Sequence, residues 1–289
     1  MMIPSRKWHP SSSRRCRSLG LMPYTLRKHD GLGNDFLVFD LAQGTPDEPW
    51  DVLARRWCDR ENGPGADGLL LLSGTGSTRL AMRLHNADGS RAEMSGNGIR
   101  CLVMAAHTAT DNPVGTTYRV DTDAGPREAT VISRDDDGTL HISVDMGEVT
   151  DLPEPGNWAG LGCHPDRPVR HVSLGNPHSV VGVDDVAVVD LKALGEKVPQ
   201  VNLEIIEPGP GPHEITMRVH ERGAGITRAC GTGACAAADA AYAWGLVPRS
   251  APEVTVHMDG GSARVRVSPE RRATLIGPTV HVGDHTVQA

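Results

Sequence analysis

Two stretches of the chain are apolar at almost every position, and each follows a Gly-x-Gly turn. Residues 93–106 read Glu-Met-Ser-Gly-Asn-Gly-Ile-Arg-Cys-Leu-Val-Met-Ala-Ala, and residues 228–241 read Arg-Ala-Cys-Gly-Thr-Gly-Ala-Cys-Ala-Ala-Ala-Asp-Ala-Ala. A run that is apolar nearly all round is typical of a buried helix. Because the second stretch repeats the plan of the first, the pattern indicates a duplicated fold with one buried helix in each half.

The remaining pattern predicts mainly short strands separated by turn residues. In the first half we expect strands at 24–29, 35–40, 69–72, 80–84, 117–122, 128–133 and 140–145, and a helix at 49–59. In the second half we expect strands at 169–174, after residue 178, at 201–206, at 215–220, and from 254 to the end with breaks at 259–261 and 277–278, and a helix near 190–197. Mostly antiparallel strands around one buried helix per half predict an α+β fold. Regular strand–helix alternation and a dinucleotide fingerprint are both absent from the sequence.

Two segments rich in glycine are predicted to be loops. Residues 150–168, which are also rich in proline, are the expected linker or loop between two lobes. Residues 29–35 read His-Asp-Gly-Leu-Gly-Asn-Asp and suit a hairpin turn. There Gly31 and Gly33 would supply unusual backbone angles, and Asn34 a polar side chain.

Composition narrows the function classes. The 289 residues are enough for two lobes, and the formal net charge of −7 argues against a nucleic-acid or membrane-surface role. No apolar run reaches the ~18 residues of a membrane-spanning helix. Residues 1–22 carry five Lys or Arg side chains and no acidic one, so we expect a disordered or mis-assigned leader outside the fold. The leader has no apolar segment for secretion, which makes the cytoplasm the expected location.

The six cysteines form neither a disulfide pattern nor a metal-binding pattern. Cys101 and Cys235 fall inside the two predicted helices, where a small apolar role is expected. Ser95 and Cys230 differ from these because each immediately precedes a Gly-x-Gly turn. The start of a helix carries a partial positive charge and unpaired N–H groups. Each motif therefore predicts a reactive side chain beside an anion-binding site, and two motifs suggest that both halves face one ligand.

Seven motifs in order give the chain, over residues 23–289, a resemblance to the diaminopimelate epimerase family. They are His29-Asp-Gly-Leu-Gly-Asn34-Asp35-Phe36, Asn86-Ala-Asp-Gly-Ser90, Gly96-Asn97-Gly98-Ile-Arg100-Cys101, Gly175-Asn176-Pro177-His178, Val201-Asn202, Glu221-Arg222-Gly-Ala-Gly225 and Ala229-Cys230-Gly231-Thr232-Gly233. The resemblance implies an isomerase that converts LL-2,6-diaminopimelate to the meso form in the lysine and peptidoglycan pathway, without a cofactor. It also implies a homodimer and two pseudo-symmetric lobes, 23–145 plus 276–289 and 146–275, with the active site in the cleft between them.

The resemblance also implies the site residues. Cys230 and the residue at position 95 match two bases on opposite faces of the substrate α-carbon, and His178 and Glu221 match positions that set the protonation of those bases. The positions that match substrate-binding residues are Asn34, Asn86, Gly96, Asn97, Asn176, Asn202, Glu221, Arg222, Gly231 and Thr232. No metal is implied. We expect the helix N-terminus to lower the thiol pKa of Cys230 towards the operating pH, which would suit a general base.

A pyridoxal phosphate enzyme could also remove an α-proton, but it needs a Schiff-base lysine. The four lysines, at positions 7, 28, 192 and 197, lie outside any phosphate-binding context. The cofactor-free route is therefore the prediction.

Ser95 departs from the family pattern, in which a cysteine occupies this position. A serine hydroxyl is far less acidic than a thiol, although it can still donate a proton. The chain could thus be an active Ser/Cys epimerase, a related cofactor-independent racemase, or an impaired or engineered Cys-to-Ser variant that only binds ligand. Gly68, where many members have glutamine, and Ile226, where an acidic residue is common, are two further departures.

Overall fold

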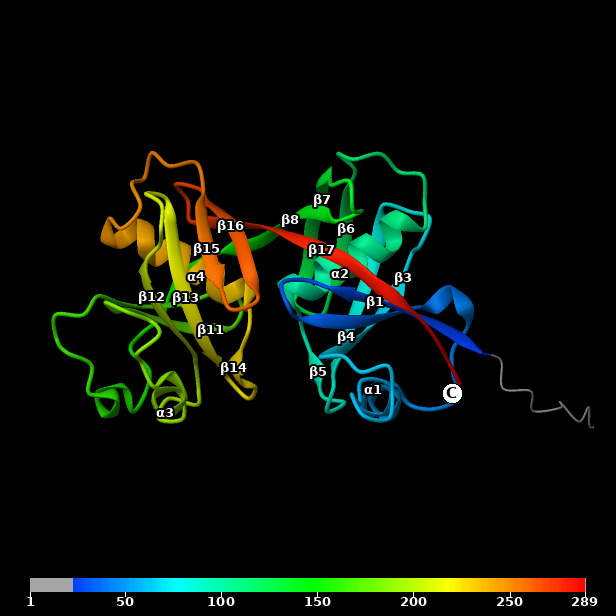
Figure 1. Cartoon of the computed structure of the whole chain (residues 1–289), viewed down its shortest axis with the longest axis horizontal. Helices are drawn as coiled ribbons and strands as arrows, with labels where there is room; N and C mark the ends of the chain where they lie inside the picture. The colour runs from blue at the N-terminus through cyan, green and yellow to red at the C-terminus, as the bar shows by residue number, and fades with distance from the viewer. Residues whose placement is uncertain (1–22, 289) are drawn as a thin grey trace, which may run out of the picture.

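Both Gly-x-Gly motifs begin long helices, α2 at Gly96–Thr108 and α4 at Gly231–Trp244. The structure is a computed structural model and describes residues 23–288; the predicted leader lies outside them. Every residue of α2 from Gly96 to His107 is buried, and α4 is buried over nearly its whole length. Strands contact each helix on several sides (Figure 1). The two predicted buried helices are confirmed, with Cys101 and Cys235 inside them and fully buried.

The first half of the chain surrounds α2. Its elements are β1 (Tyr24–Asp30), β2 (Asp35–Asp40), the 3-10 turn η1 (Leu41–Gln43), α1 (Trp50–Trp57), β3 (Gly68–Ser73), β4 (Arg79–Asn86), β5 (Arg91–Ala92), β6 (Thr117–Thr122), β7 (Gly125–Arg134) and β8 (Leu140–Glu148). The strands pair in the order β1–β2–β3–β4–β6–β7–β8. The last strand of the chain, β17 (Arg272–Val287), pairs with both β8 and β1 and so closes the ring.

The second half surrounds α4. Its elements are β9 (Thr150–Asp151), the 3-10 turn η2 (Trp158–Leu161), β10 (Val169–Ser173), β11 (Pro177–Gly182), α3 (Leu191–Gly195), β12 (Asn202–Pro208), β13 (Glu214–Glu221), β14 (Gly225–Thr227), β15 (Val254–Met258) and β16 (Gly261–Val267). Here the order is β10–β11–β12–β13–β15–β16–β17. No helix among the described residues combines the length and apolar character needed to cross a membrane.

The same order of elements occurs twice. The parallel pairs β2–β3 and β4–β6 of the first half correspond to β11–β12 and β13–β15 of the second. In each half a very short strand, β5 or β14, pairs with the strand before it and leads directly into the buried helix. The duplication that the two motifs predict is therefore present in the strand pairing, and the strands are mostly antiparallel, as expected.

The two groups of elements are joined by strands. Figure 1 shows β8 and β17 running from one group to the other. Residues 273–276 of β17 pair with β16, and residues 280–287 pair with β1. The expected break at Gly277-Pro278 is wrong, because β17 continues through it. Pro278 lies opposite His141 of β8, and Gly277 lies where β17 changes partners, beside the guanidinium of Arg100.

The expected linker at 150–168 is also wrong in part. Its first residues form β9, which pairs with β10, and η2 follows within the second half. Trp158 and Leu161 of η2 are buried in a hydrophobic cluster with Val181 and Leu203. Residues 152–168 therefore cover the second half, and β8 makes the connection between the halves. Proline and glycine content could not distinguish a covering loop from a linker.

The hairpin loop between β1 and β2 reaches the second half. Left-handed φ angles belong to Leu32 and Gly33, so the expectation for Gly31 is wrong. A Cβ on Gly31 would instead lie 3.3 Å from the guanidinium of Arg100, which makes close packing the reason for glycine. On the other side, the carbonyl oxygen of Leu32 would lie 1.9 Å from a Cβ built on Gly260.

We expect Gly260→Ala to lower the free energy of unfolding by about 1–3 kcal/mol, because backbone atoms of Leu32 leave no room for a methyl group. Urea unfolding monitored by circular dichroism measures the change. Gly156→Ala is the matched control, since Gly156 is exposed and its Cβ would have no neighbour within 4 Å. Equal midpoints for the two variants would show that the loop between β1 and β2 moves freely away from Gly260.

Candidate active site

Ser95 and Cys230 are the N-cap residues of the two buried helices. The Ser95 Oγ accepts a hydrogen bond from the backbone N–H of Gly98 at 3.0 Å, and the Cys230 Sγ accepts one from Gly233 at 3.4 Å. In both caps the bond spans three residues, and both backbones are extended at the cap. The two side chains therefore have equivalent places in the two halves.

The two helix N-termini meet. A Cβ built on Gly231 would lie 3.5 Å from the Cα of Gly96 and 2.8 Å from a methyl group of Leu275. Glycine at both positions permits this approach and leaves the amides uncovered. Within residues 23–288, the backbone N–H groups of Gly96, Asn97, Gly231 and Thr232 make no hydrogen bond. Four N–H groups at two positive helix ends form a site suited to a carboxylate.

A chain of polar contacts supports the Ser95 side. The Asn97 Nδ2 donates to the Asn34 Oδ1 at 3.2 Å, and the Asn34 Nδ2 donates to Asp67 at 2.8 Å. The Arg100 Nη2 donates to the Asn97 Oδ1 at 2.9 Å. Burial lowers the pKa of Arg100 to about 10, so the guanidinium stays charged at neutral pH. Asn34 and Asn97 are thus brought together, with a buried cation behind them.

A second chain of contacts lies on the Cys230 side. The Thr232 Oγ1 is 3.5 Å from the Cys230 Sγ and accepts from the Asn176 Nδ2 at 3.2 Å. The Asn176 Oδ1 is 3.1 Å from the His178 Nε2. The structure therefore joins four of the residues expected at the site, Cys230, Thr232, Asn176 and His178, into one network.

Glu204 completes this network, although it is not among the site residues predicted from the sequence. Its Oε1 is 2.6 Å from the His178 Nδ1, and both side chains are fully buried. Alternate residues of a strand share a face, so Glu204 lies on the same face of β12 as Asn202, towards α4. Asn202 pairs with His178 of the neighbouring strand β11. In the sequence, Glu204 could have been recognised as a site residue because it is a carboxylate within an otherwise apolar strand, two residues after Asn202.

Cys230 is a neutral thiol in this environment. Burial, followed by the nearby carboxyl groups of Glu221 and Glu204, raises its pKa well above the usual value. The hydrogen bonds with Thr232 and Gly233 act in the opposite direction and are outweighed. The expectation that the helix N-terminus lowers this pKa is wrong for the structure as described. Desolvation and two acidic neighbours exceed the effect of the helix end.

The other expected site residues are less closely connected. The Asn202 Oδ1 accepts from the backbone N–H of Arg222 at 2.8 Å, and Glu221 accepts from Thr227. Asn86 is exposed and donates to Ser90 at 3.0 Å. Among the described residues, the Asn86 side chain makes no hydrogen bond with either network. Arg222 is exposed, and its backbone N–H rather than its guanidinium bonds to Asn202.

Comparison with known proteins places the chain in a family. The family model described as diaminopimelate epimerase matches residues 26–152 and 170–282. The diaminopimelate epimerase of Thermosynechococcus vestitus is 38% identical over 303 residues, covering 92% of this chain and 100% of that protein. That of Desulfitobacterium hafniense is 38% identical over 277 residues, covering 88% and 95%. The chain belongs to the diaminopimelate epimerase family.

Solved structures of other proteins share the family's fold. A predicted epimerase from Pseudomonas aeruginosa matches with a TM-score of 0.70 at 15% identity, over 92% of this chain and 99% of that one. A hydroxyproline epimerase from Agrobacterium vitis, with bound trans-4-hydroxy-L-proline, matches with a TM-score of 0.64 at 17% identity, over 92% and 91%. At these identities the likeness establishes the α+β fold.

One departure from the pattern of diaminopimelate epimerases has a local cause. Gly68 begins β3 and pairs with Asn86 of β4. A Cβ there would lie 2.9 Å from the carbonyl oxygen of His85 and 3.2 Å from the ring of Phe36. A side chain at Gly68 would require the carbonyl oxygen of His85 to shift, so the strand pairing at this position favours glycine over glutamine.

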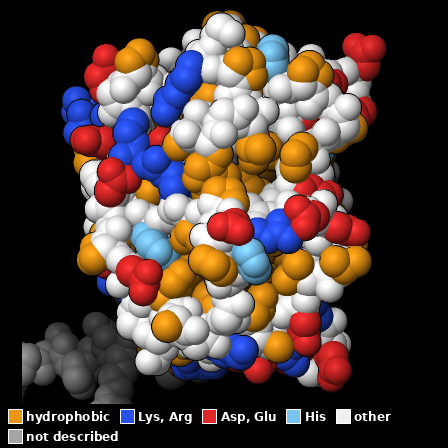
Figure 2. All heavy atoms as spheres, turned by 90° about the vertical axis from the view of Figure 1, so that its left-hand side faces the viewer, with side chains coloured by type: hydrophobic (Ala, Val, Ile, Leu, Met, Phe, Trp, Pro, Cys, Tyr) orange, Lys and Arg blue, Asp and Glu red, His pale blue; other side chains and the backbone are white. Residues whose placement is uncertain are grey.

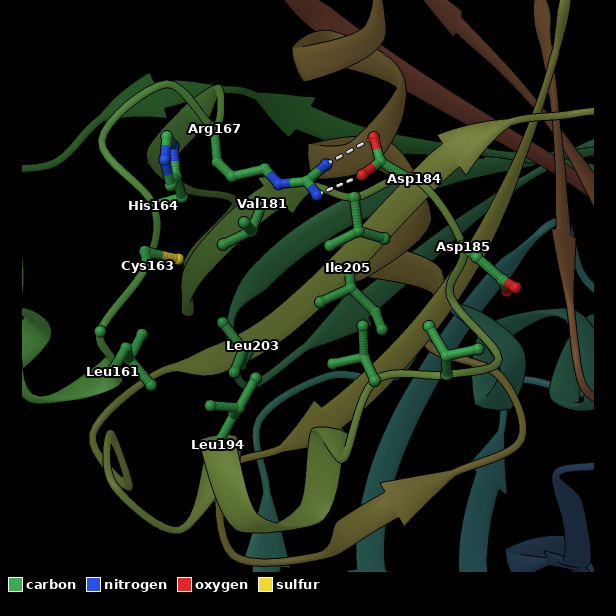
Figure 3. A pocket seen from close by; sticks show the side chains of 14 residues that line it. Leu161, Cys163, His164, Arg167, Val181, Asp184, Asp185, Leu194, Leu203 and Ile205 are labelled. Carbon is green, nitrogen blue, oxygen red and sulfur yellow. Dashed lines mark hydrogen bonds and ion pairs between the residues drawn. The ribbon is translucent and has the colours of Figure 1, made fainter.

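An apolar hollow lies elsewhere on the second half. It has a volume of about 330 Å³ and opens beside residues 161–167, with Val181, Leu203 and Ile205 on one wall (Figure 3). Figure 2 shows this end of the molecule, where hydrophobic side chains are exposed among charged ones. Val181, Leu203 and Ile205 alternate with His178, Asn202 and Glu204 along β11 and β12, so the sheet separates the hollow from Cys230.

Proposed function

We propose that the protein epimerises LL-2,6-diaminopimelate to the meso form by moving a proton from one face of an α-carbon to the other, without a cofactor. One observation carries the proposal. The N-termini of α2 and α4 meet, and each is capped by a side chain capable of proton transfer, Ser95 or Cys230. Two reactive groups that flank one anion site are what two-base epimerisation requires.

The substrate carboxylate next to the reacting carbon would bind the amides of residues 96, 97, 231 and 232. An amino-acid α-proton is very weakly acidic, and its loss places negative charge on the carbon and its carboxylate. Preorganised N–H donors at this position stabilise that charge when it develops. Because the donors belong to two buried helices, they need little reorganisation during the reaction.

Cys230 and Ser95 would act from opposite faces of the α-carbon. In one direction the Cys230 thiolate takes the α-proton and becomes a thiol, while the Ser95 hydroxyl gives its proton to the other face and becomes an alkoxide. In the other direction both transfers reverse. His178 and Glu221 would set the protonation of these groups, because His178 belongs to the Cys230 network and the Glu221 carboxylate acts on the thiol.

The distal amino-acid end of diaminopimelate would meet the remaining polar side chains. These are Asn34, Asn86, Asn176, Asn202 and Arg222. The short contacts from Asn34 to Asn97 and from Asn176 to Thr232 connect this set to both helix ends. Glu221 would also contact the substrate in this region. A mono-amino acid would leave part of this polar set unpaired.

The two groups of elements would act as pseudo-symmetric lobes, 23–145 plus 276–289 and 146–275, with the substrate in the cleft between them. The repeated strand order and the change of partners along β17 near residues 277–279 support this division. Closing the lobes on the substrate would exclude water and strengthen each polar contact. Family resemblance supports a homodimer located in the cytoplasm as part of the same proposal.

Deuterium uptake at the α-carbon in deuterated water tests the proposed function. LL-diaminopimelate should exchange, whereas L-lysine and L-proline should exchange far more slowly, because each buried polar group left unpaired costs roughly 1–3 kcal/mol. Nuclear magnetic resonance of the substrate measures all three rates. Comparable rates would favour a broader racemase. Binding of diaminopimelate with no exchange would favour a ligand-binding protein, the alternative that Ser95 suggests.

A further inference from the structure

Glu204 is a buried carboxyl group with one unused oxygen. Its side chain has no exposed surface, and the Oε1 is held 2.6 Å from the His178 Nδ1. Among the described residues, the Oε2 has no hydrogen-bond partner. Leaving a buried carboxylate oxygen unpaired is costly, because it forfeits the hydration that the oxygen has in water. A carboxyl group that can take up a proton avoids part of this cost.

Glu204 and the Cys230 thiol both lie beside the Cα of Gly233. A Cβ built on Gly233 would lie 2.8 Å from the Glu204 Oε1 and 3.3 Å from the Cys230 Sγ. The second glycine of the Gly-x-Gly motif therefore keeps open the space where these two groups approach each other. Glu221, the other acidic residue near Cys230, is instead partly exposed and bonded to Thr227.

We propose that Glu204 is the positioning residue that makes Cys230 a base, by accepting the thiol proton before the α-proton is removed. The proton leaves the Cys230 Sγ and ends on the Glu204 carboxylate, so a thiol and a carboxylate become a thiolate and a carboxylic acid. His178 fixes the Oε1 and thereby the direction of the carboxyl group. The inference rests on the proposed function, because it assigns Cys230 the role of base.

Charge conservation permits this step. Burial raises the pKa of Glu204 and that of Cys230, and the Glu204 carboxylate further disfavours the thiolate. Transfer between them moves one negative charge without creating a second. The charged or titratable neighbours acting on the pair are His178 and Glu221. A pair of this kind shares one proton, so the thiolate population depends little on solution pH across the range where the pair carries a single charge.

Glu204→Gln tests the inference, since glutamine keeps the shape and can still accept from His178 but cannot take the proton. The rate of Cys230 labelling by iodoacetamide, mapped by mass spectrometry across neutral pH, reports thiolate without turnover. In the wild-type chain labelling should depend weakly on pH. In Glu204→Gln it should fall at neutral pH and then rise about tenfold per pH unit. The kcat/KM for diaminopimelate should follow the same change of profile.

Two variants act as controls. Glu207→Gln makes the same chemical change on the same strand, at a residue bonded to the backbone of Val186, and should leave the labelling profile unchanged. Glu204→Asp retains a carboxyl group and should keep a weak pH dependence. Faster labelling of Glu204→Gln at neutral pH would show that Glu204 only repels the thiolate, which overturns the proposal. A uniform loss of rate at all pH values, or an unlabelled wild-type Cys230, would also overturn it. Absence of turnover with normal labelling would instead count against the proposed function.

Discussion

Cys230→Ala is expected to abolish α-proton exchange from both LL- and meso-diaminopimelate. One diastereomer presents its α-hydrogen to Cys230 and loses the base that removes it. The other presents its α-hydrogen to Ser95, whose hydroxyl is far less acidic than a thiol and lacks a proton acceptor of its own, so it is a poor base without Cys230. General acid–base groups contribute about 10²–10⁴-fold to a rate, so exchange should fall by at least this factor.

Loss of exchange in Cys230→Ala must be distinguished from loss of folding, because Cys230 also caps α4. Cys230→Ser restores the cap, since serine is a better N-cap than cysteine or alanine. It should unfold at a temperature close to that of the wild type and still exchange far more slowly, because a serine hydroxyl is far less acidic than a thiol. Cys163→Ala is the thiol control, as Cys163 is exposed and lies far along the chain from the motif. Exchange that survives undiminished in Cys230→Ala would remove Cys230 from the mechanism.

The repeated fold could be predicted because its cause is local in the sequence. An apolar run after Gly-x-Gly predicts each buried helix. The strands alternate apolar and polar residues or are rich in β-branched residues. The family resemblance then predicted which polar residues share the substrate site. The structure shows contacts between Asn34 and Asn97 and between Asn176 and Thr232, residues far apart in the chain.

Features that depend on distant packing could not be predicted. Gly277-Pro278 looks like a strand break, but β17 changes partners there and continues because β8 and Arg100 occupy its two sides. Trp158 and Leu161 lie in a segment that looks like a linker, yet their burial is decided by the outer face of β11 and β12. Local composition contains neither piece of information.

The direction of the pKa shift of the Cys230 thiol also could not be predicted from the sequence. The helix N-terminus is visible in the sequence and predicts a lowered pKa. Burial and the carboxyl groups of Glu221 and Glu204 are not visible, and together they reverse the sign. The thiol therefore needs an internal proton acceptor before it can act as a base, a requirement that motif reading alone does not reveal.

Ser95→Cys is expected to raise epimerisation by about 10²–10⁴-fold, and most strongly from the diastereomer whose α-hydrogen faces residue 95. In the unaltered chain the Cys230 thiolate can remove and return a proton on its own face, which gives exchange with retention. Inversion additionally requires the Ser95 hydroxyl to lose its proton, and each pKa unit of mismatch costs about 1.4 kcal/mol. Among the described residues, the Ser95 Oγ hydrogen-bonds only with the Gly98 amide, whereas the carboxyl groups of Glu221 and Glu204 act on the Cys230 thiol.

Separate deuterium uptake by LL- and meso-diaminopimelate measures this asymmetry. The unaltered chain should exchange one diastereomer much faster than the other, and Ser95→Cys should bring the two rates together. Ser95→Ala should keep the faster exchange and lose inversion, since Cys230 and its network remain intact. Equal exchange of both diastereomers in the unaltered chain, with no gain in Ser95→Cys, would mean that Ser95 is already an adequate base.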